Sequence, residues 1–180
     1  FDVTVNDNQD PSVSCVGNQT KVTDAGQCYY TVVGTEFNPT ASSDNCAVAS
    51  VINDFNGLAS LAAEQIPEGT TTITWTVTDV NGRTSTCSFD VTVNDNQDPS
   101  VSCVGDQTKV TDAGQCYYTV SGTEFDPTAS ADNCAVASTI NDFNGLATLD
   151  GAQIPEGTTT ITWTVTDVNG RTSTCSFDVT

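Results

Sequence analysis

The feature that most constrains this chain is an internal repeat of 88 residues. Residues 1–88 and 89–176 differ at only nine positions, so that Cys15 returns as Cys103 and Trp75 returns as Trp163. A unit of this length is longer than a solenoid repeat and has the size of a small independent domain. The sequence therefore predicts two copies of one domain.

The border between the copies is predicted in a stretch that occurs twice, FDVTVNDNQDPSVSC, at residues 1–15 and 89–103. In its first half Phe89, Val91 and Val93 alternate with polar residues, which is the period of a half-buried strand. Residues 94–98 are polar, and Pro99 stops the strand ladder. We therefore expect a fragment of a preceding repeat at residues 1–5 and two domains at 6–93 and 94–180. The second domain is cut in its last strand, as in a slice of a longer array.

The alternation inside each copy predicts an all-β fold. Residues 70–78 place Ile73, Trp75 and Val77 on one face and threonines on the other, and a turn at 79–82 leads to a partner strand at 83–93. Shorter strands are expected around residues 13–15, 28–33 and 46–52, while 17–27 and 34–45 have the composition of loops. Residues 58–65 are ambiguous and too short for a stable helix. Strands at this spacing indicate an antiparallel β-sandwich.

The charge of the chain excludes several functions. Four Lys and Arg residues stand against 23 Asp and Glu residues, which gives a net charge of −19. This charge argues against nucleic acid and against an anionic membrane surface as partners. No run of about 18 apolar residues offers a membrane span. The chain has no His and no glycine-rich phosphate loop, so we predict that it is not an enzyme.

The eight cysteines, four in each copy, indicate an oxidising compartment outside the cytoplasm. Zinc is not favoured, because the chain has no His and no C-x-x-C pair. Four cysteines allow three pairings, and the direction of the expected strands favours joining cysteines at the same end of the domain. The predicted disulfides are Cys15–Cys28, Cys46–Cys87, Cys103–Cys116 and Cys134–Cys175.

Three separated motifs resemble the hyalin repeat family of immunoglobulin-like extracellular modules. They are Asp44-Asn45-Cys46, then IPEGTTTITWTVTD at residues 66–79, then TCSF at 86–89, and all three recur in the second copy. The resemblance implies tandem immunoglobulin-like sandwiches outside the cell. Near-identical repeats with cysteines also resemble the giant surface adhesins of gliding Bacteroidota, which implies a bacterial cell surface. The stretch NDNQDP at residues 6–11 is similar to the calcium-binding linker of cadherins, with a longer spacing before the proline.

Acidic loops are expected to meet at one end of each sandwich. Strands that run alternately up and down sort the loop before Cys46 and the turn at 79–82 to the end where the chain enters. Calcium takes 6–8 oxygen ligands of the kind gathered there, so we predict Ca²⁺ as a cofactor. The alternative is that these side chains only satisfy turns through local hydrogen bonds. The candidate ligands are Asn8, Asp10, Asp44 and Asp79 in the first copy and Asp95, Asn96, Asp98, Asp132 and Asp167 in the second.

Two interpretations of the function remain open. In the first, the chain is a non-catalytic structural spacer of a long surface filament, stapled by disulfides and stiffened by calcium. Its partners would then be neighbouring repeats of the same chain, and lateral self-association is an open question. In the second, each repeat is an adhesion module that binds carbohydrate or protein, with Tyr29 and Tyr117 as the aromatic contact residues.

Overall fold

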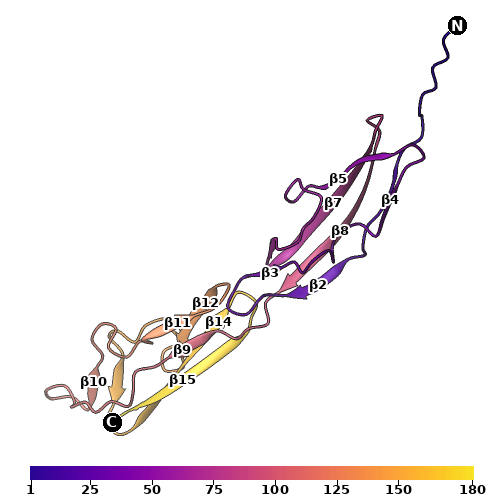
Figure 1. Cartoon of the computed structure of the whole chain (residues 1–180). Coiled ribbons are helices and arrows are strands. Elements are labelled where there is room, and N and C mark those ends of the chain that lie inside the picture. Colours follow the sequence, from indigo (N-terminus) through magenta and orange to yellow (C-terminus); the bar gives the residue numbers. More distant parts are fainter. The chain divides into compact units, whose positions relative to one another are not determined.

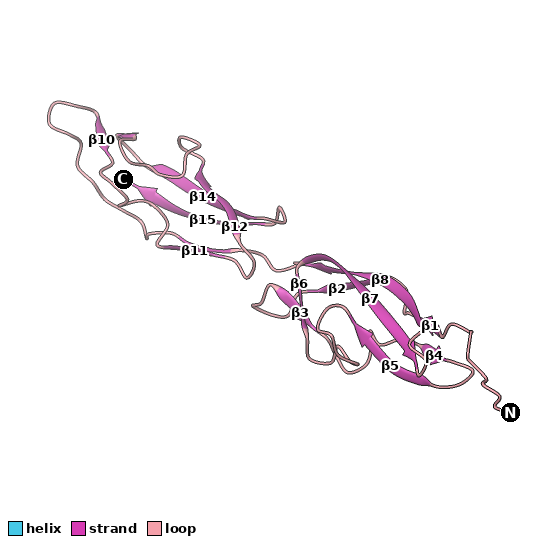
Figure 2. Ribbon diagram, turned by 90° about the horizontal axis from the view of Figure 1, so that it is seen from above, coloured by secondary structure: helices cyan, strands magenta, loops and turns pink.

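The structure is a computed structural model that describes all residues, 1–180, and consists of strands, turns and loops without a helix (Figure 1). Its contacts divide the chain into two compact units, Phe1–Asp95 and Asn96–Thr180. Each unit is an antiparallel β-sandwich of the immunoglobulin-like kind, which confirms the predicted fold class. Figure 2 shows strands and connecting loops alone in both units.

The first repeat is built on one four-stranded sheet in the order β2-β8-β7-β5 and two short strand pairs, β1 with β4 and β3 with β6. The strands are β1 (Ser12–Ser14), β2 (Gln19–Val22), β3 (Tyr29–Thr31), β4 (Ala41–Ser43), β5 (Val48–Asn53), β6 (Gln65–Pro67), β7 (Gly69–Asp79) and β8 (Thr84–Asn94). The two long strands β7 and β8 form the predicted hairpin, which confirms the strongest alternation in the sequence.

The second repeat follows the same plan with a three-stranded sheet in the order β12-β14-β15 and the pairs β9 with β11 and β10 with β13. Its strands are β9 (Ser100–Ser102), β10 (Tyr117–Thr119), β11 (Ala129–Ala131), β12 (Val136–Asn141), β13 (Gln153–Pro155), β14 (Thr159–Asp167) and β15 (Thr172–Val179). In place of a β2 equivalent it has an isolated parallel bridge between Gln107 and Val179.

The core of each repeat comes from the inward face of the long hairpin. Ile73, Trp75 and Val77 are fully buried, while the threonines between them face outward, as a period of two requires. The indole N–H of Trp75 donates to the carbonyl of Phe37 at 3.0 Å, so the buried polar atom is satisfied. The second repeat has the same bond from Trp163 to Phe125, at 3.1 Å.

Several short elements differ from the sequence predictions. The segment 17–27 was expected to be a turn region, but it contains β2, which pairs in parallel with the end of β8. The strands expected around residues 13–15 and 28–33 are present as β1 and β3, but their partners β4 and β6 lie in segments whose Pro, Gly and Asn content indicated loops or turns. Residues 58–65 form turns that insert Leu61, fully buried, into the core. Strands of three residues inside Pro-containing segments, such as β4 and β6, carry too little alternation to be recognised in a sequence.

Candidate metal site and disulfides

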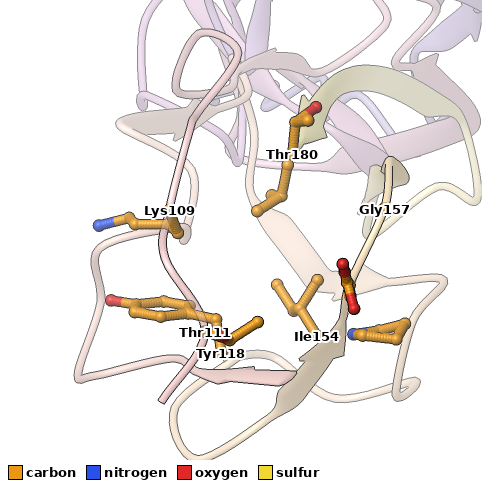
Figure 3. A pocket seen from close by; sticks show the side chains of 9 residues that line it. Lys109, Thr111, Tyr118, Ile154, Gly157 and Thr180 are labelled. Atoms are coloured by element: carbon orange, nitrogen blue, oxygen red, sulfur yellow. The ribbon is translucent and has the colours of Figure 1, made fainter. Parts of the chain in front are cut away.

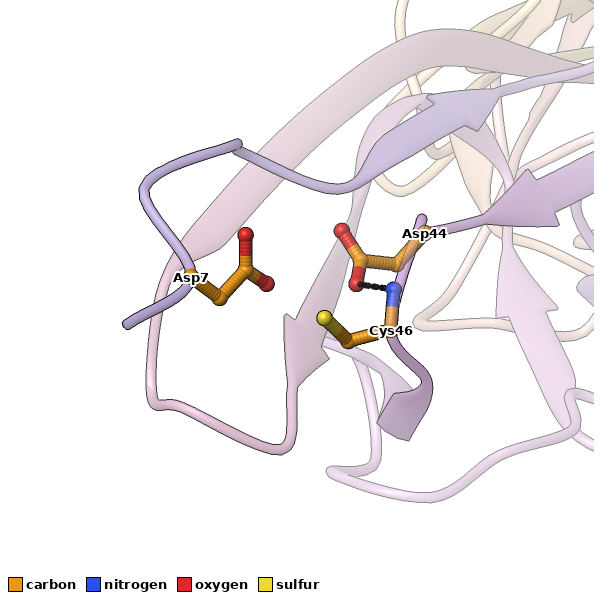
Figure 4. A group of neighbouring side chains, drawn as sticks. All are labelled: Asp7, Asp44 and Cys46. Carbon is orange, nitrogen blue, oxygen red and sulfur yellow. Dashed lines mark hydrogen bonds between the residues drawn. The ribbon is translucent and has the colours of Figure 1, made fainter. Parts of the chain in front are cut away.

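In the first repeat, two acidic side chains meet where the chain enters the sandwich. Carboxylate oxygens of Asp7 and Asp44 and the sulfur of Cys46 all lie within 4.8 Å of one another (Figure 4). Asp7 comes from the incoming segment, whereas Asp44 and Cys46 come from the loop between β4 and β5. The amide of Asn45 ties the two segments together by donating to Asp7 Oδ1 at 3.3 Å.

One oxygen of each carboxylate has a structural partner, and the other has none. Asp44 Oδ2 accepts from the amides of Cys46, at 2.9 Å, and Ala47, at 3.2 Å, and Asp7 Oδ1 accepts from the amide of Gln9 at 3.0 Å. The Gln9 amide lowers the pKa of the Asp7 carboxyl below its usual value. Asp44 Oδ1 and Asp7 Oδ2 are buried without a hydrogen-bond partner. Buried polar atoms nearly always have a hydrogen-bond partner, and a bound ion is one explanation for those that have none.

Asp79 adds a third carboxylate to this end of the repeat. It is 1% exposed, and its Oδ1 accepts from the amides of Asn81 and Arg83 at 2.8 Å each, which closes the β7–β8 hairpin. Its Oδ2 is also buried without a hydrogen-bond partner. The amide of Val80 donates to Ala47 at 3.1 Å, which joins this hairpin to the loop that carries Asp44. Three carboxylates from three segments therefore each have one buried oxygen without a hydrogen-bond partner.

The second repeat reproduces the two carboxylates that lie within its own fold. Asp132 Oδ2 accepts from the amides of Cys134 and Ala135, and its Oδ1 is buried without a partner. Asp167 is 1% exposed, and it too has one bonded oxygen and one buried oxygen without a partner. Asp95 is buried, and its Oδ1 accepts from the hydroxyl of Thr23 at 3.2 Å.

Two other predicted ligands form ion pairs. Asp10 forms an ion pair with Arg83 at 2.7 Å, and Asp98 forms one with Arg171 at 2.7 Å. An arginine just after each hairpin turn therefore reaches the acid of this segment. Asn8 and Asn96 are exposed.

Asp7 is not among the predicted ligands, although its equivalent 88 positions later, Asp95, is one of them. The repeat offset of 88 residues is therefore the sequence signal that points to Asp7. Asp7 also precedes Pro11 by the same spacing with which Asp95 precedes Pro99, so the hinge stretch itself contained the information.

The sulfur of Cys46 is a poor metal ligand in this setting. A hydrogen bond to Asp7, burial, and the negative charges of Asp7, Asp44 and Asp79 all raise the pKa of the Cys46 thiol. Only the thiolate binds metals strongly, and carboxylate oxygens suit Ca²⁺ rather than soft metals. The donors that remain are hard oxygens, which fit calcium.

The predicted disulfide pairing was wrong. The structure joins Cys15 to Cys87 and Cys103 to Cys175, with a Cα–Cα distance of 5.7 Å in each pair. Cys46 and Cys116 are free thiols, whereas all eight cysteines were predicted to be bonded in pairs within one repeat.

The error came from the path of the chain after Cys15. The prediction took residues 17–27 as one turn that keeps Cys15 and Cys28 at the same end. Instead, β2 runs alongside β8 from Gln19 to Val22 and carries the chain to the far end of the sandwich. Cys15, which directly follows β1, is left opposite Cys87 in the first half of β8.

A small hollow in the second repeat does not support a ligand site. It has a volume of about 70 Å³, and Lys109, Tyr118 and Ile154 are among its lining residues (Figure 3). Pockets for small ligands usually measure about 300–1,000 Å³. Gly157 also lines the hollow. Its equivalent in the first repeat, Gly69, instead pairs with Val93 in the β7–β8 sheet ladder. Tyr29 and Tyr117, the expected aromatic contacts, are half-buried.

The chain has no helix that is long and apolar enough to cross a membrane.

Two disulfide-stapled β-sandwiches in tandem define the chain as a pair of adhesion-type repeat domains of extracellular or surface proteins. Residues 6–93 and 94–180 each match the HYR domain family, and the chain belongs to this family. It is 29% identical over 174 residues to hyalin of Strongylocentrotus purpuratus, covering 92% of this chain and 13% of hyalin. The chain thus spans a small part of that relative's length.

Solved cadherin structures are also similar to the chain. Human mucin-like protocadherin EC1-2 has 12% identity and a TM-score of 0.43, covering 96% of this chain and 98% of that one. Drosophila N-cadherin EC1-4 has 10% identity and a TM-score of 0.41, covering 95% of this chain and 49% of that one.

Proposed function

We propose that the chain is a non-catalytic, load-bearing spacer of a long extracellular filament, with calcium bound where the chain enters each repeat. The observation that carries the proposal is the bond between Cys15 and Cys87, which are 72 residues apart. Cys15 follows the first strand of the repeat, and Cys87 lies in the last one. The second repeat has the same bond between Cys103 and Cys175.

This bond changes how a repeat responds to tension. Cys15 lies close to the point where the chain enters the repeat, and Cys87 lies close to the point where it leaves. A force applied to the two ends of the chain therefore acts on these two residues. The covalent bond then carries the force past the interior of the repeat, so that its 72 residues cannot be drawn out even if the sandwich opens. A spacer that holds a distal tip needs this resistance to extension, whereas a binding module does not.

Single-molecule force spectroscopy on the chain of residues 1–180 tests the proposal. Between oxidising and reducing buffer, the extension at unfolding should increase by about 250 Å per repeat, because 72 residues are released at about 3.5 Å each. Replacing the free thiols, with Cys46→Ser and Cys116→Ser, is the matched control and should leave both traces unchanged. Release of the full interior length in oxidising buffer would refute a load-bearing role for this bond.

Calcium supplies the stiffening part of the proposal. Asp7, Asp44 and Asp79 each have a buried oxygen without a hydrogen-bond partner, and a divalent cation shared by them would replace repulsion with ligation. The HYR repeat at 94–180 contains the equivalent residues Asp95, Asp132 and Asp167. An ion held by the incoming segment and two loops of the sandwich would restrict the hinge between consecutive repeats.

Thermal melting with and without calcium tests this part. If the sites bind with the millimolar to submillimolar affinity of extracellular modules, 10 mM Ca²⁺ should stabilise each repeat by about 1.4–2.7 kcal/mol. Asp44→Asn with Asp132→Asn keeps an oxygen that can accept the turn hydrogen bonds but removes the charge, and it should abolish the rise in Tm.

The matched control for the calcium experiment is Asp10→Asn with Asp98→Asn. These carboxylates pair with Arg83 and Arg171, so the control should still show the calcium-dependent rise. A chain whose melting does not respond to calcium or to a chelator would leave the hinge as a polar linker. A control that loses the rise would instead place Asp10 and Asp98 among the ligands.

The location of the filament rests on the sequence. The near-identity of the two copies and their cysteines resemble the repeat arrays of gliding Bacteroidota, which supports a bacterial cell surface. Near-identical repeats suit a spacer, because each repeat has the same length and the same resistance to unfolding under force.

A further inference from the structure

One asparagine of the first repeat has the sequence context of a modification site. Asn18-Gln19-Thr20 is the only place in the chain where an asparagine precedes Ser or Thr by two positions without an intervening proline. This pattern is the acceptor sequence for the attachment of a sugar to the asparagine side chain in exported proteins. The other candidate, Asn38-Pro39-Thr40, is excluded by its proline.

The fold presents Asn18 and Thr20 to solvent. Both residues are exposed, and they lie where the loop after β1 leads into β2. The strand β2 is an edge of the four-stranded sheet, because it pairs with β8 alone. Residues two positions apart in an extended chain point to the same side, so an enzyme can reach the amide of Asn18 and the hydroxyl of Thr20 together.

Only one of the two polar atoms of the Asn18 side chain has a partner in the repeat. Its Oδ1 accepts from the amide of Asp90, on β8, at 3.0 Å. Its Nδ2, the atom that carries the sugar in a glycosylated asparagine, makes no hydrogen bond to the protein. The side-chain carbonyl remains after glycosylation, so the bond from Asp90 can persist. The geometry therefore holds the acceptor side chain in place and leaves its nitrogen available.

The second repeat shows that the fold does not need this nitrogen. Asp106 lies at the equivalent position, and its Oδ1 accepts from the amide of Asp178 at the same distance, 3.0 Å. Gln107 and Thr108 follow it, so the second copy departs from the acceptor sequence at a single residue. Asn and Asp have the same structural role here, but only Asn offers an amide nitrogen. The two copies are thus a natural matched pair.

We propose that Asn18 is a glycosylation site and that the first repeat carries an N-linked sugar beside β2. The donor is a sugar activated by a diphosphate at its anomeric carbon, either a lipid-linked oligosaccharide or a nucleotide sugar. Asn18 Nδ2 forms a bond to the anomeric carbon. The bond from this carbon to the diphosphate oxygen breaks, and the diphosphate leaves with the electron pair. One proton of the amide nitrogen passes to a base of the transferase.

A sugar at this position covers an open edge of the sheet. The unpaired backbone groups of an edge strand are a template to which another chain can add. A bulky, hydrated sugar beside β2 hinders this addition and keeps the repeat soluble. The inference goes beyond the spacer role, and it depends neither on the Cys15–Cys87 bond nor on calcium.

Mass spectrometry of the chain exported by its own cells tests the proposal. The chain is reduced, alkylated and cut after Lys and Arg, which places Asn18 in peptide 1–21, Asn38 in peptide 22–83 and Asp106 in peptide 84–109. We expect the mass of sugar residues on peptide 1–21 alone. A single sugar identifies a nucleotide sugar as the donor, whereas a uniform oligosaccharide identifies a lipid-linked donor.

A gain of modification is the sharpest variant. Asp106→Asn completes the acceptor sequence with Gln107 and Thr108, so peptide 84–109 should acquire the same sugar mass as peptide 1–21. Thr20→Val keeps Asn18 and removes only the hydroxyl, and it should abolish the modification of peptide 1–21.

The matched loss variant is Asn18→Asp, which copies the second repeat. It should leave peptide 1–21 without sugar. Made in cells that lack such transferases, it should melt at the same temperature as the unaltered chain, because an aspartate can also accept from the Asp90 amide. Three results would overturn the proposal: an unmodified peptide 1–21 in the unaltered chain, a sugar that persists in Thr20→Val, or an Asp106→Asn chain that gains none.

Discussion

At the scale of single residues, each repeat combines a lysine, a glutamate and a tyrosine above a core aromatic ring. In the second repeat the Lys109 ammonium lies 2.5 Å from Glu124 Oε2 and 5.3 Å from the centre of the Phe125 ring. The hydroxyl of Tyr118 donates to Glu124 Oε1 at 2.6 Å. The first repeat repeats this arrangement with Lys21 and Glu36.

This arrangement predicts an unusually acidic glutamate. Burial raises the pKa of Glu124, but hydrogen bonds from Lys109, the Ser121 amide and Tyr118 outweigh it and lower the pKa from 4.5 to about 2. Because the folded pKa is depressed, the resulting stability is present above about pH 4.5 and is lost as the pH falls towards 2. Carboxyl ¹³C NMR of Glu124 should show a midpoint near pH 2.

The matched variants are Lys109→Met and Lys21→Met. The first should move the Glu124 midpoint up towards its ordinary value, and the second should leave Glu124 unchanged while it raises the pKa of Glu36. A Glu124 midpoint near 4.5 in the unaltered chain would contradict the prediction.

The cations of the first repeat, Lys21 and Arg83, pair with Glu36 and Asp10. The particular acid could not be predicted, because Arg83 and Asp10 are 73 residues apart and meet only when the hairpin folds against the incoming segment. Both an aspartate paired with arginine and an aspartate with an unpaired oxygen are simply Asp in the sequence, so the sequence does not distinguish them.

At the scale of elements, the segment between β5 and β6 closes the core without regular structure. Leu61 is fully buried, whereas Leu58, three residues earlier, is 59% exposed. The turn is fixed by Asn53, whose side chain donates to the carbonyl of Leu58 at 2.8 Å and accepts from the amides of Phe55 and Asn56. Polar side chains thus replace the hydrogen bonds that a helix would have supplied.

Truncation of these two leucines should have very different effects. Leu61→Ala removes buried methyl groups and leaves a cavity, so the free energy of unfolding of this repeat should fall by about 2–5 kcal/mol. Leu58→Ala should change it by no more than about 0.5 kcal/mol. Chemical denaturation measures both values, and equal effects would show that the segment does not plug the core.

The elements divide clearly into predictable and unpredictable ones. The β7–β8 hairpin could be predicted, because eleven residues of strict alternation on each side leave one register that buries Trp75. The strand β2 could not, because QTKV shows no more alternation than a turn and gains its ladder only from the edge of β8. The wrong disulfide pairing followed from this one missed strand.

At the scale of the whole molecule, the two repeats have separate hydrophobic cores. The buried cluster of the first contains Trp75 and Phe89 and that of the second contains Trp163 and Phe177, and the clusters share no residue. The repeat of 88 residues predicted this organisation directly. The sequence could not show which two cysteines of each repeat bond with each other, because four cysteines allow three pairings.

A chain of residues 6–95 should therefore fold alone, because it includes all of the first core and the β2–β8 pairing. We expect cooperative melting with an unfolding enthalpy near 60 kcal/mol at about 60 °C, as is usual for roughly 90 residues. In the folded fragment, Cys15–Cys87 should remain intact while the exposed Cys46 reacts with a thiol reagent. Calorimetry and thiol counting in the same sample measure both properties. A fragment that stays unfolded in oxidising buffer would show that the repeat depends on its neighbour.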